Sequence, residues 1–535
     1  MQKSLDYFML ISSEEKGSQI RPALYGAAHT DTISIFGPRA YEKCLARESS
    51  AKFRPTYGNF ALVSREGATI RISTDHFGLF RIYLYRDGTR WALSDSFYSL
   101  VQYVKAKAWP ITPYLPSVYS FFLPGGLGHQ MVSFKTVAKE IELVPHWNDI
   151  IIDEQGISLT DESRQKCNSS VDDAIRDAGV FFGSLIKGYL SHEFRPYLTL
   201  SAGLDSRCTL AAILGGLPPS MWPAVGMFTH KGDKWKHEKD IVFELCQTYC
   251  LKCISERPCS RHPNWQEWKH CFLGTQSHFA SYPRPLIPAP RLTGGSGELV
   301  KPFYEWRGSL EGICFPPYIS KKWKNSILED IEASVTLGRS VMPPELPVEM
   351  VHYQMFRNRF HFGRQISDSV FNIPILVDAL LQNYNSGRKY SNLHKLILSL
   401  GGRELLEQPF DDISKAWDKA GEPASLKAGV EGRLEASSIQ SRQVIFSPDE
   451  GGGYVDLASY ANKPNDAYYP RYELYEGLLN EARCSIELVR ECGIVEDWCV
   501  DQAERQFDLL KQNGAATNPN ALRAILALVS LELLL

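Results

Sequence analysis

Short segments of alternating hydrophobic and polar residues fill the first 160 positions of the chain. Each segment is rich in β-branched and aromatic residues and ends at Gly, Asp or Ser, a pattern typical of β-strands. An Asp-Gly pair at residues 87–88 is a hairpin signal. The pattern predicts a β-rich layer domain with few helices, closed by strands within residues 137–156. The predicted strands lie in YFMLISS, TISIFG, GNFALVSRE, ATIRISTD, FRIYLYRDG and RWALSDS.

The hydrophobic pattern then changes its period. Residues 170–192 have the apolar spacing of a helix with Ser170 as the expected N-cap, and an apolar strand follows at residues 197–200. Beyond it, apolar strands alternate with helical stretches, which is typical of a parallel sheet covered by helices. Helices dominate the last third of the chain. The sequence therefore predicts an α/β protein of two domains, residues 1–162 and 163–535.

The overall charge excludes some classes of partner. A formal net charge of -3 gives no basic surface for nucleic acid or for an anionic membrane. The first residues, MQKSLD, lack the basic and apolar regions of a secretory signal. The apolar run at residues 521–535 is shorter than the roughly 20 residues of a membrane span and contains Arg523 and Glu532, so we expect a terminal helix packed on the body. These features predict a cytoplasmic protein with neither a nucleic-acid nor a membrane partner.

Three of the twelve cysteines raise the question of a cluster. Cys246, Cys250 and Cys253 have the C-x3-C-x2-C spacing of a radical iron–sulfur enzyme. Alternatively, Cys246 and Cys250 lie on the inner face of a helix and Cys253 begins the next strand, where a thiol acts as a small hydrophobic side chain. We favour this structural interpretation, because nothing around the segment repeats as in a barrel.

The turn after the strand at residues 197–200 is suited to an anion. A strand that leads through small residues into a helix points backbone N–H groups at one spot, and the helix N-terminus adds positive charge there. No Gly-Lys-Ser/Thr follows, so the turn is not a Walker loop. A carboxylate at Asp205 suits the organisation of Mg²⁺ beside phosphates. The alternative is a plain strand-to-helix turn with Asp205 or Ser206 as N-cap, and Arg207 has no role in either interpretation.

This turn resembles the pyrophosphate loop, Ser-Gly-Gly-x-Asp-Ser, of the asparagine synthetase superfamily, with Ala202 in place of the first glycine. The segment LTGGSGELV at residues 292–300 resembles that family's second glycine loop, Ser/Thr-Gly-x-Gly-x-Asp, with Glu298 at the acidic position. The resemblance implies that ATP is bound and that Asp205 and Glu298 hold Mg²⁺. The implied nucleotide-binding residues are Ser201, Ala202, Gly203, Leu204, Asp205, Ser206, Met227, Phe228, Gly294 and Gly295, of which Met227 and Phe228 would meet the adenine edge through their backbone.

The resemblance extends over nearly the whole chain. Its further segments are residues 73–101, 118–147, 353–381 and 392–412. It implies an N-terminal domain like class II glutamine amidotransferases, with the αββα layers of Ntn hydrolases. It also implies a C-terminal parallel α/β synthetase domain of the pyrophosphatase-loop type, like the adenine nucleotide α-hydrolases.

Position 2 departs from the family pattern. Glutamine-using members carry a catalytic cysteine directly after the initiator Met, whereas this chain has Gln2. Cys44 cannot supply both the thiolate and the free α-amino base of an N-terminal nucleophile, so we expect no glutaminase activity. A synthetase loop without a glutaminase resembles β-lactam synthetases and lasso-peptide macrolactam cyclases, which use an amine already present on the substrate.

The catalytic side chains are also altered. Gly295 lies where some members carry Glu or Tyr, and the family's Arg-Pro-Lys lysine falls near residues 408–410, which contain no lysine. Lys415 and Lys395 are the nearest candidates, and each is alternatively a solvated surface lysine. Arg357 and its neighbour Arg359 either bind a substrate carboxylate or the adenylate, or pair on a helix face.

These observations predict an ATP-dependent, AMP-forming amide synthetase. It would adenylate a carboxylate on a small molecule or peptide and condense it with an amine, expected on the same substrate, as in antibiotic biosynthesis. The alternatives are amidation with free ammonia and a non-catalytic scaffold of this fold, while a tRNA-modifying relative would need a basic surface. A homodimer or a pathway-enzyme partner is left open.

Overall fold

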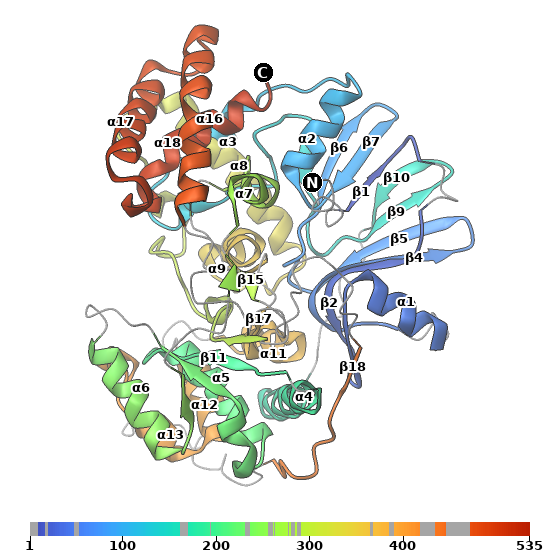
Figure 1. Ribbon diagram of the computed structural model, residues 1–535, viewed down its shortest axis with the longest axis vertical. Coiled ribbons are helices and arrows are strands. Elements are labelled where there is room, and N and C mark those ends of the chain that lie inside the picture. The colour runs from blue at the N-terminus through green and yellow to red at the C-terminus, as the bar shows by residue number, and fades with distance from the viewer. Residues whose placement is uncertain are drawn as a thin grey trace.

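The computed structural model shows a mixed α/β protein that contains several sheets, one of them parallel. Figure 1 shows antiparallel sheets from the N-terminal part beside a parallel sheet and a group of C-terminal helices. The structure describes residues 9–15, 20–47, 53–160, 169–192, 194–229, 236–254, 260–261, 263–276, 278–279, 284–285, 290–363, 367–384, 390–417, 434–445 and 471–535.

Two sheets, antiparallel except for one strand from later in the chain, form the N-terminal part. The first has the order β1 (Leu10–Ser12), β7 (Arg90–Ser94), β6 (Tyr83–Asp87) and β8 (Ile141–Leu143). The second has the order β10 (Gly156–Leu159), β9 (Ile150–Asp153), β5 (Thr69–Thr74), β4 (Tyr57–Glu66), β2 (Ala23–His29), β3 (Ile33–Phe36) and β18 (Gln443–Ile445). The strands predicted in the six segments and in residues 137–156 are confirmed.

The two sheets pack face to face. Alternate residues of β4 and β5, among them Val63 and Ile72, share one apolar cluster with Leu84 and Leu93 of the smaller sheet. On the outer faces, α1 (Pro38–Arg47) packs on the larger sheet and α2 (Phe97–Ala106) on the smaller one. Because alternate side chains of a strand point to opposite faces, each sheet is buried on both sides.

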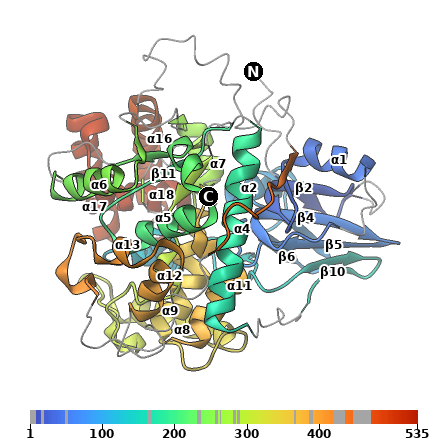
Figure 2. The ribbon, with the colours of Figure 1, turned by 90° about the horizontal axis from the view of Figure 1, so that it is seen from below.

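Strand β18 connects the two predicted domains. It belongs to the sequence after residue 163, yet it pairs parallel with β3 at Gln443–Ile33 through Ile445–Ile35. Figure 2 shows this C-terminal segment lying against the N-terminal sheet beside α4 (Val171–Ser191). A part of the second predicted domain therefore completes a sheet of the first.

A five-stranded sheet forms the second part. Its order is β13 (Lys252–Cys253), β12 (Gly226–Phe228), β11 (Tyr197–Thr199), β16 (Arg291–Thr293) and β17 (Ser367–Asp368), and every pair is parallel. Helices α4, α5 (Leu204–Gly216) and α12 (Ser391–Gly401) pack on one another beside this sheet. The predicted helix with Ser170 as N-cap is confirmed, since the Ser170 side chain accepts a hydrogen bond from Asp173 N.

The remaining helices connect these sheets and form the C-terminal group. A helical group of α16 (Arg471–Cys492), α17 (Asp497–Asn513) and α18 (Arg523–Glu532) closes the chain, and α18 is buried, as predicted for the terminal apolar run. The other helices are α3 (Leu115–Ser120), α6 (Lys236–Thr248), α7 (Trp265–Phe272), α8 (Lys321–Arg339), α9 (Val348–His352), α10 (Asn358–Phe362), α11 (Pro374–Gln382) and α13 (Arg403–Glu407). Among the described helices, none has both the length and the apolar character to cross a membrane.

The cysteine prediction is correct at one residue and wrong at another. Cys246 is buried on α6, as expected for an inner face. Cys250 is exposed, because the helix ends at Thr248 and the chain turns there with a φ of 51° at Cys250. Within the described ranges, no group of three His, Cys, Asp or Glu residues is arranged to hold a metal ion.

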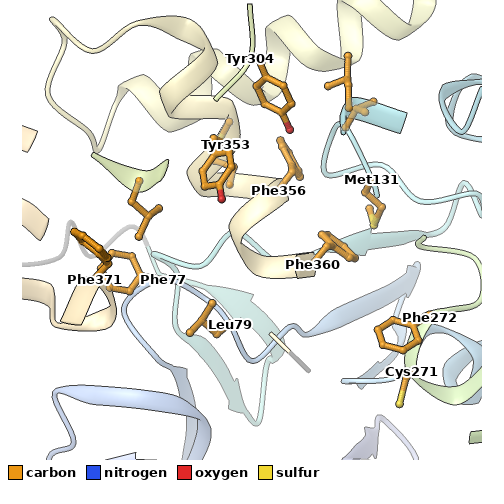
Figure 3. Packing of buried hydrophobic residues seen from close by; sticks show 14 of the residues in the cluster. Phe77, Leu79, Met131, Cys271, Phe272, Tyr304, Tyr353, Phe356, Phe360 and Phe371 are labelled. Carbon is orange, nitrogen blue, oxygen red and sulfur yellow. The ribbon is translucent and has the colours of Figure 1, made fainter. Parts of the chain in front are cut away.

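One helical stretch, residues 348–362, joins the N-terminal part to the rest of the core. Figure 3 shows Phe356 and Phe360 of this stretch in the same apolar cluster as Phe77 and Leu79 of the N-terminal part. Arg359 lies in this contact, 1% exposed, and donates from Nε to Gly78 O at 2.9 Å and from Nη2 to Val144 O at 3.0 Å. Arg359 therefore neither binds a substrate nor pairs on a helix face, because its guanidinium holds N-terminal backbone carbonyls.

His352 makes the stability of this core dependent on pH. Its ring is buried, with Nε2 2.9 Å from Val132 O, and burial lowers the pKa of the imidazole to about 4. In the unfolded chain the pKa is near 6.5, so the unfolded state binds more protons between these two values. The contribution of neutral, buried His352 to the free energy of unfolding is therefore fully present above pH 6.5. It is lost progressively as the pH falls from 6.5 towards about 4.

We expect the free energy of unfolding to be about 2 kcal/mol lower at pH 5 than at pH 7.5 on account of this one residue. Urea unfolding of the wild type and of His352→Gln at both pH values measures the effect. The variant should be less stable at pH 7.5 but should lose less stability on acidification. An equal loss in both proteins would contradict the assignment to His352.

Candidate functional site

Two loops leave the parallel sheet side by side. Strands β11 and β16 are neighbours, with Thr199 opposite Thr293 at their carboxyl ends. The first loop therefore runs from Ser201 into α5, and the second passes through Gly294 beside it. Loops at the carboxyl ends of parallel strands are the usual ligand sites of open α/β sheets.

The first loop is held by Ser206. Its Oγ accepts from Ser201 N at 3.1 Å and donates to Ser201 O at 2.9 Å, which closes the loop over Ala202 and Gly203. Helix α5 begins at Leu204, its N-cap is Gly203, and no side chain caps it in the described structure. The prediction of Asp205 or Ser206 as N-cap is thus wrong, and the first N–H groups of the helix remain suited to an anion.

The second loop packs directly on the first. A Cβ on Gly294 would lie 2.2 Å from Ser206 N, and a Cβ on Gly297 would lie 2.5 Å from Asp205 Cγ. Ser296 between them adopts a left-handed conformation with a φ of 69°. Its side chain is fully buried, and its Oγ has no hydrogen-bond partner in the described structure. A strained residue with an unsatisfied hydroxyl is typical of a ligand site.

Four polar side chains meet where the loops touch. Lys301 Nζ donates to both carboxylate oxygens of Asp205, at 2.5 and 2.6 Å, and Tyr353 Oη donates to Glu298 Oε2 at 3.2 Å. Burial, together with the charge of Asp205, raises the pKa of Glu298. Burial opposes the charge of Lys301, but the two carboxylates raise its pKa overall. The structure thus brings Asp205 and Glu298 together around one ammonium group.

Arg207, which has no role in the sequence interpretation, connects the first loop to residues 408–410. Its Nη1 donates to Gln408 O at 2.8 Å and its Nη2 to Pro409 O at 2.5 Å. Its guanidinium also lies 3.8 Å from the centre of the Phe410 ring. This fully buried arginine therefore fixes the segment that follows against α5.

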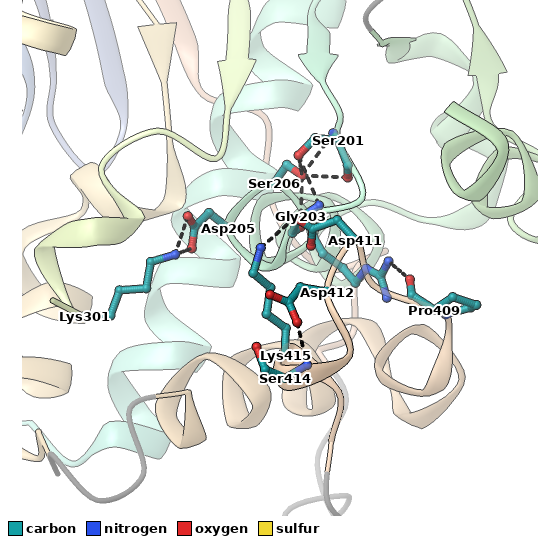
Figure 4. A network of polar contacts seen from close by, with 11 residues as sticks. Ser201, Gly203, Asp205, Ser206, Lys301, Pro409, Asp411, Asp412, Ser414 and Lys415 are labelled. Carbon is teal, nitrogen blue, oxygen red and sulfur yellow. Dashed lines mark hydrogen bonds and ion pairs between the residues drawn. The ribbon is translucent and has the colours of Figure 1, made fainter. Parts of the chain in front are cut away.

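Because Arg207 holds residues 408–410 against α5, the following Lys415 lies beside the first loop. Asp411 N donates to Ala202 O at 3.2 Å, and Lys415 Nζ donates to Asp411 Oδ2 at 2.6 Å. Figure 4 shows both ion pairs, Asp205 with Lys301 and Asp411 with Lys415, next to Gly203. Of the two lysines predicted as catalytic candidates, Lys415 is the one that reaches the loops.

The other catalytic candidates lie elsewhere. Lys395 pairs with Asp172 at 2.8 Å, at the start of α4. Arg357 donates from Nη1 to Gln130 Oε1 at 3.0 Å, within a group of basic side chains. Neither has a hydrogen bond or ion pair to the two loops in the described structure.

The backbone carbonyl groups at the positions predicted to contact adenine accept hydrogen bonds from neighbouring segments of the sheet instead. Met227 O accepts from Ile254 N at 2.9 Å, and Phe228 O accepts from Leu200 N at 2.8 Å. Both residues are buried in β12. Their carbonyl groups are therefore committed to the sheet, and a ligand at this strand end would contact later residues, of which 230–235 lie outside the described structure. Gln2 lies outside it as well.

Parts of the two loops have the chemistry that would hold phosphate and a divalent cation. The N–H groups at the start of α5, beside the glycines at the contact, would be the groups to receive phosphate oxygens, whereas the Ser296 hydroxyl is buried. Two carboxylates suit a Mg²⁺ ion that arrives with phosphates, since Mg²⁺ usually takes only one or two protein carboxylates. Lys301 now neutralises Asp205, so Mg²⁺ binding there requires this ammonium to move.

No protein-family model matches the chain, and no curated protein matches it.

The contact between the loops leads to a stability prediction. Gly294→Ala places a Cβ 2.2 Å from Ser206 N, so the loops must separate. We expect a loss of about 1–3 kcal/mol, the range typical of overpacking. The control is Gly203→Ala in the same loops, whose nearest contact is the Ser201 Oγ at 3.2 Å. Urea unfolding measures both, and a Gly294→Ala variant as stable as the Gly203→Ala control would contradict the packing.

Proposed function

We propose that the chain is an ATP-dependent, AMP-forming amide synthetase of the asparagine synthetase superfamily. The observation that supports this most is the meeting of two loops from adjacent parallel strands, which brings Asp205 and Glu298 together with Lys415 alongside. The N-terminal sandwich with α1 and α2 is consistent with an Ntn-hydrolase-like domain, and the parallel sheet with an adenine nucleotide α-hydrolase-like domain.

In this proposal the first loop holds the β- and γ-phosphates of ATP. A substrate carboxylate oxygen attacks the α-phosphorus, the bond to the bridging oxygen breaks, and pyrophosphate leaves. The N–H groups of α5 stabilise the departing charge at a helix N-terminus, and Lys415 supplies a full positive charge from the side of Asp411. Asp205 and Glu298 would hold Mg²⁺, which would supply further charge neutralisation to the phosphates.

The amide then forms by attack of an amine nitrogen on the activated carbonyl carbon, with AMP as leaving group. The amine loses a proton during this step. Gly295 carries no side chain that could accept it. Glutamine is not the expected nitrogen source because of Gln2, so an amine of the same substrate is proposed.

A non-catalytic scaffold is a second candidate. Two observations favour it: Asp205 is already neutralised by Lys301, and Gly295 has no side chain at a position that is catalytic in some members. A scaffold would retain the loops for packing without chemistry.

Pyrophosphate exchange into ATP distinguishes these candidates. With a panel of carboxylic acids, we expect at least one acid to support exchange and Asp205→Ala to abolish it. Lys415→Met should lower the exchange rate about 10²–10³-fold, the usual effect of removing one charge-stabilising group. Lys395→Met is the matched control and should exchange like the wild type, because Lys395 pairs with Asp172. Absence of exchange with every acid would favour the scaffold, and equal effects of both lysine variants would contradict the role of Lys415.

The nitrogen source is tested with aspartate, ATP and ammonium. If the amine is intramolecular, little asparagine should form, since the site has to accommodate a longer substrate. Mass spectrometry of the products measures this. Ready asparagine formation would replace the proposed lactam-type closure with amidation by free ammonia.

A further inference from the structure

A group of basic side chains lies beside the proposed reaction site and is not used by it. Arg357 ends the π-helical turn Tyr353–Arg357, and Arg523 begins α18. Between them lie the stacked rings of His129 and His278, with centroids 4.5 Å apart and an interplanar angle of 19°. All four side chains are partly exposed, so they remain accessible to a small ligand.

Arg357 presents an unused edge of its guanidinium. Its Nη1 makes all of its hydrogen bonds, to Gln130 Oε1 at 3.0 Å, to His129 Nδ1 at 3.1 Å and to Gly126 O at 3.5 Å. In the described structure, Nη2 and Nε donate to no group. This pair of N–H groups is the fork that binds a carboxylate or a phosphate in a bidentate manner.

The charged groups that shift the pKa values of His129 and His278 are all basic side chains. Burial, followed by the charge of Arg357 and then that of Arg523, lowers the pKa of His278 to about 4. Burial and the neighbouring His278 and Arg357 also lower the pKa of His129. Among the described residues, no carboxylate contributes to either shift. The Nδ1 of His278 is buried and has no hydrogen-bond partner among the described residues.

The group is connected to the glycine loops through one helix. Tyr353, one turn before Arg357, donates to Glu298, and the Phe303 ring lies between them, 5.3 Å from Tyr353 and 5.5 Å from the Arg357 guanidinium. π-Helical turns are common at functional sites. The basic group and the second glycine loop are thus connected through Tyr353 and Phe303.

We propose that Arg357, with His129 and His278, binds a second anionic group of the substrate, a carboxylate or a phosphate. That this ligand is the substrate depends on the proposed function. The inference restricts the substrate class to acids with two anionic groups, of which one is activated at the loops and the other is held at Arg357.

Binding of simple anions tests the site without any turnover. Succinate and inorganic phosphate serve as probes in isothermal titration calorimetry of the full chain. We expect at least one of them to bind the wild type and to bind Arg357→Gln at least 10-fold more weakly. The probe that binds more tightly distinguishes a carboxylate from a phosphate. Arg403→Gln is the matched control, because Arg403 is an exposed arginine paired with Glu407 on α13.

Phosphate binding at the pyrophosphate loop must be separated from this site. Ser206→Ala removes the hydroxyl that closes that loop and should leave binding at Arg357 unchanged. His278→Gln, whose ring makes no hydrogen bond in the described structure, should also weaken binding if Arg357→Gln does not fold. The proposal is overturned if neither probe binds, or if Ser206→Ala abolishes binding while Arg357→Gln does not.

These outcomes are distinguishable from failure of the proposed function. Anion binding that depends on Arg357, without any pyrophosphate exchange, would leave the anion site valid and remove the synthetase. Exchange with a monocarboxylic acid at an unchanged rate in Arg357→Gln would leave the synthetase and remove the second anionic group.

Discussion

The buried carboxylate of Asp368 is the constraint on which the arrangement of the two parts depends. It accepts hydrogen bonds from Tyr57 of β4 at 2.9 Å and from Tyr189 of α4 at 2.7 Å. Burial raises its pKa, whereas the two hydroxyl groups lower it. A buried carboxylate without such donors is costly, so the N-terminal sheet, α4 and β17 must meet here. The next residue, Ser369, donates to Gly295 O at 2.6 Å, and the second glycine loop is therefore positioned from this centre.

The contacts around Asp368 give the N-terminal part a structural role that does not depend on any catalytic activity of that part. Its sheet supplies Tyr57 to Asp368, its turn supplies the Gly78 carbonyl to Arg359, and its β3 edge receives β18. Each contact joins sequence positions hundreds of residues apart. Removing this part would take one of the two hydroxyl donors from the Asp368 carboxylate and the Gly78 and Val144 carbonyl acceptors from the Arg359 guanidinium.

Local sequence patterns predict most of the strands and helices. The pairing of the two glycine loops follows instead from the adjacency of β11 and β16 in the parallel sheet. The alternating segments became strands and Ser170 capped its helix, because both depend on neighbours in sequence. Strand β2 was missed, since ALYGAAH is dominated by small residues and contains Gly26 with a φ of 88°. Lys301 and Arg207 were missed for another reason: their partners lie about 100 and 200 positions away, and no local period encodes such contacts. The only sequence signal for Lys301 is its position one short turn after Glu298.

Each lysine near the loops lies beside a carboxylate: Lys301 pairs with Asp205, and Lys415 pairs with Asp411. Asp205 and Glu298 carry two negative charges against one positive charge on Lys301, so the contact between the loops is already negative when both carboxylates are ionised. A helix N-terminus contributes only about half a positive charge, which cannot offset a triphosphate placed beside two carboxylates. Under the proposed function, binding of phosphates at these loops would therefore require added cations. Asp205 and Glu298 would hold a divalent ion, which would supply this charge, only if Lys301 left Asp205. Under the proposed function, Lys301 after the second loop and Lys415 in the segment beside the first loop would then supply the two positive side chains nearest to the ligand.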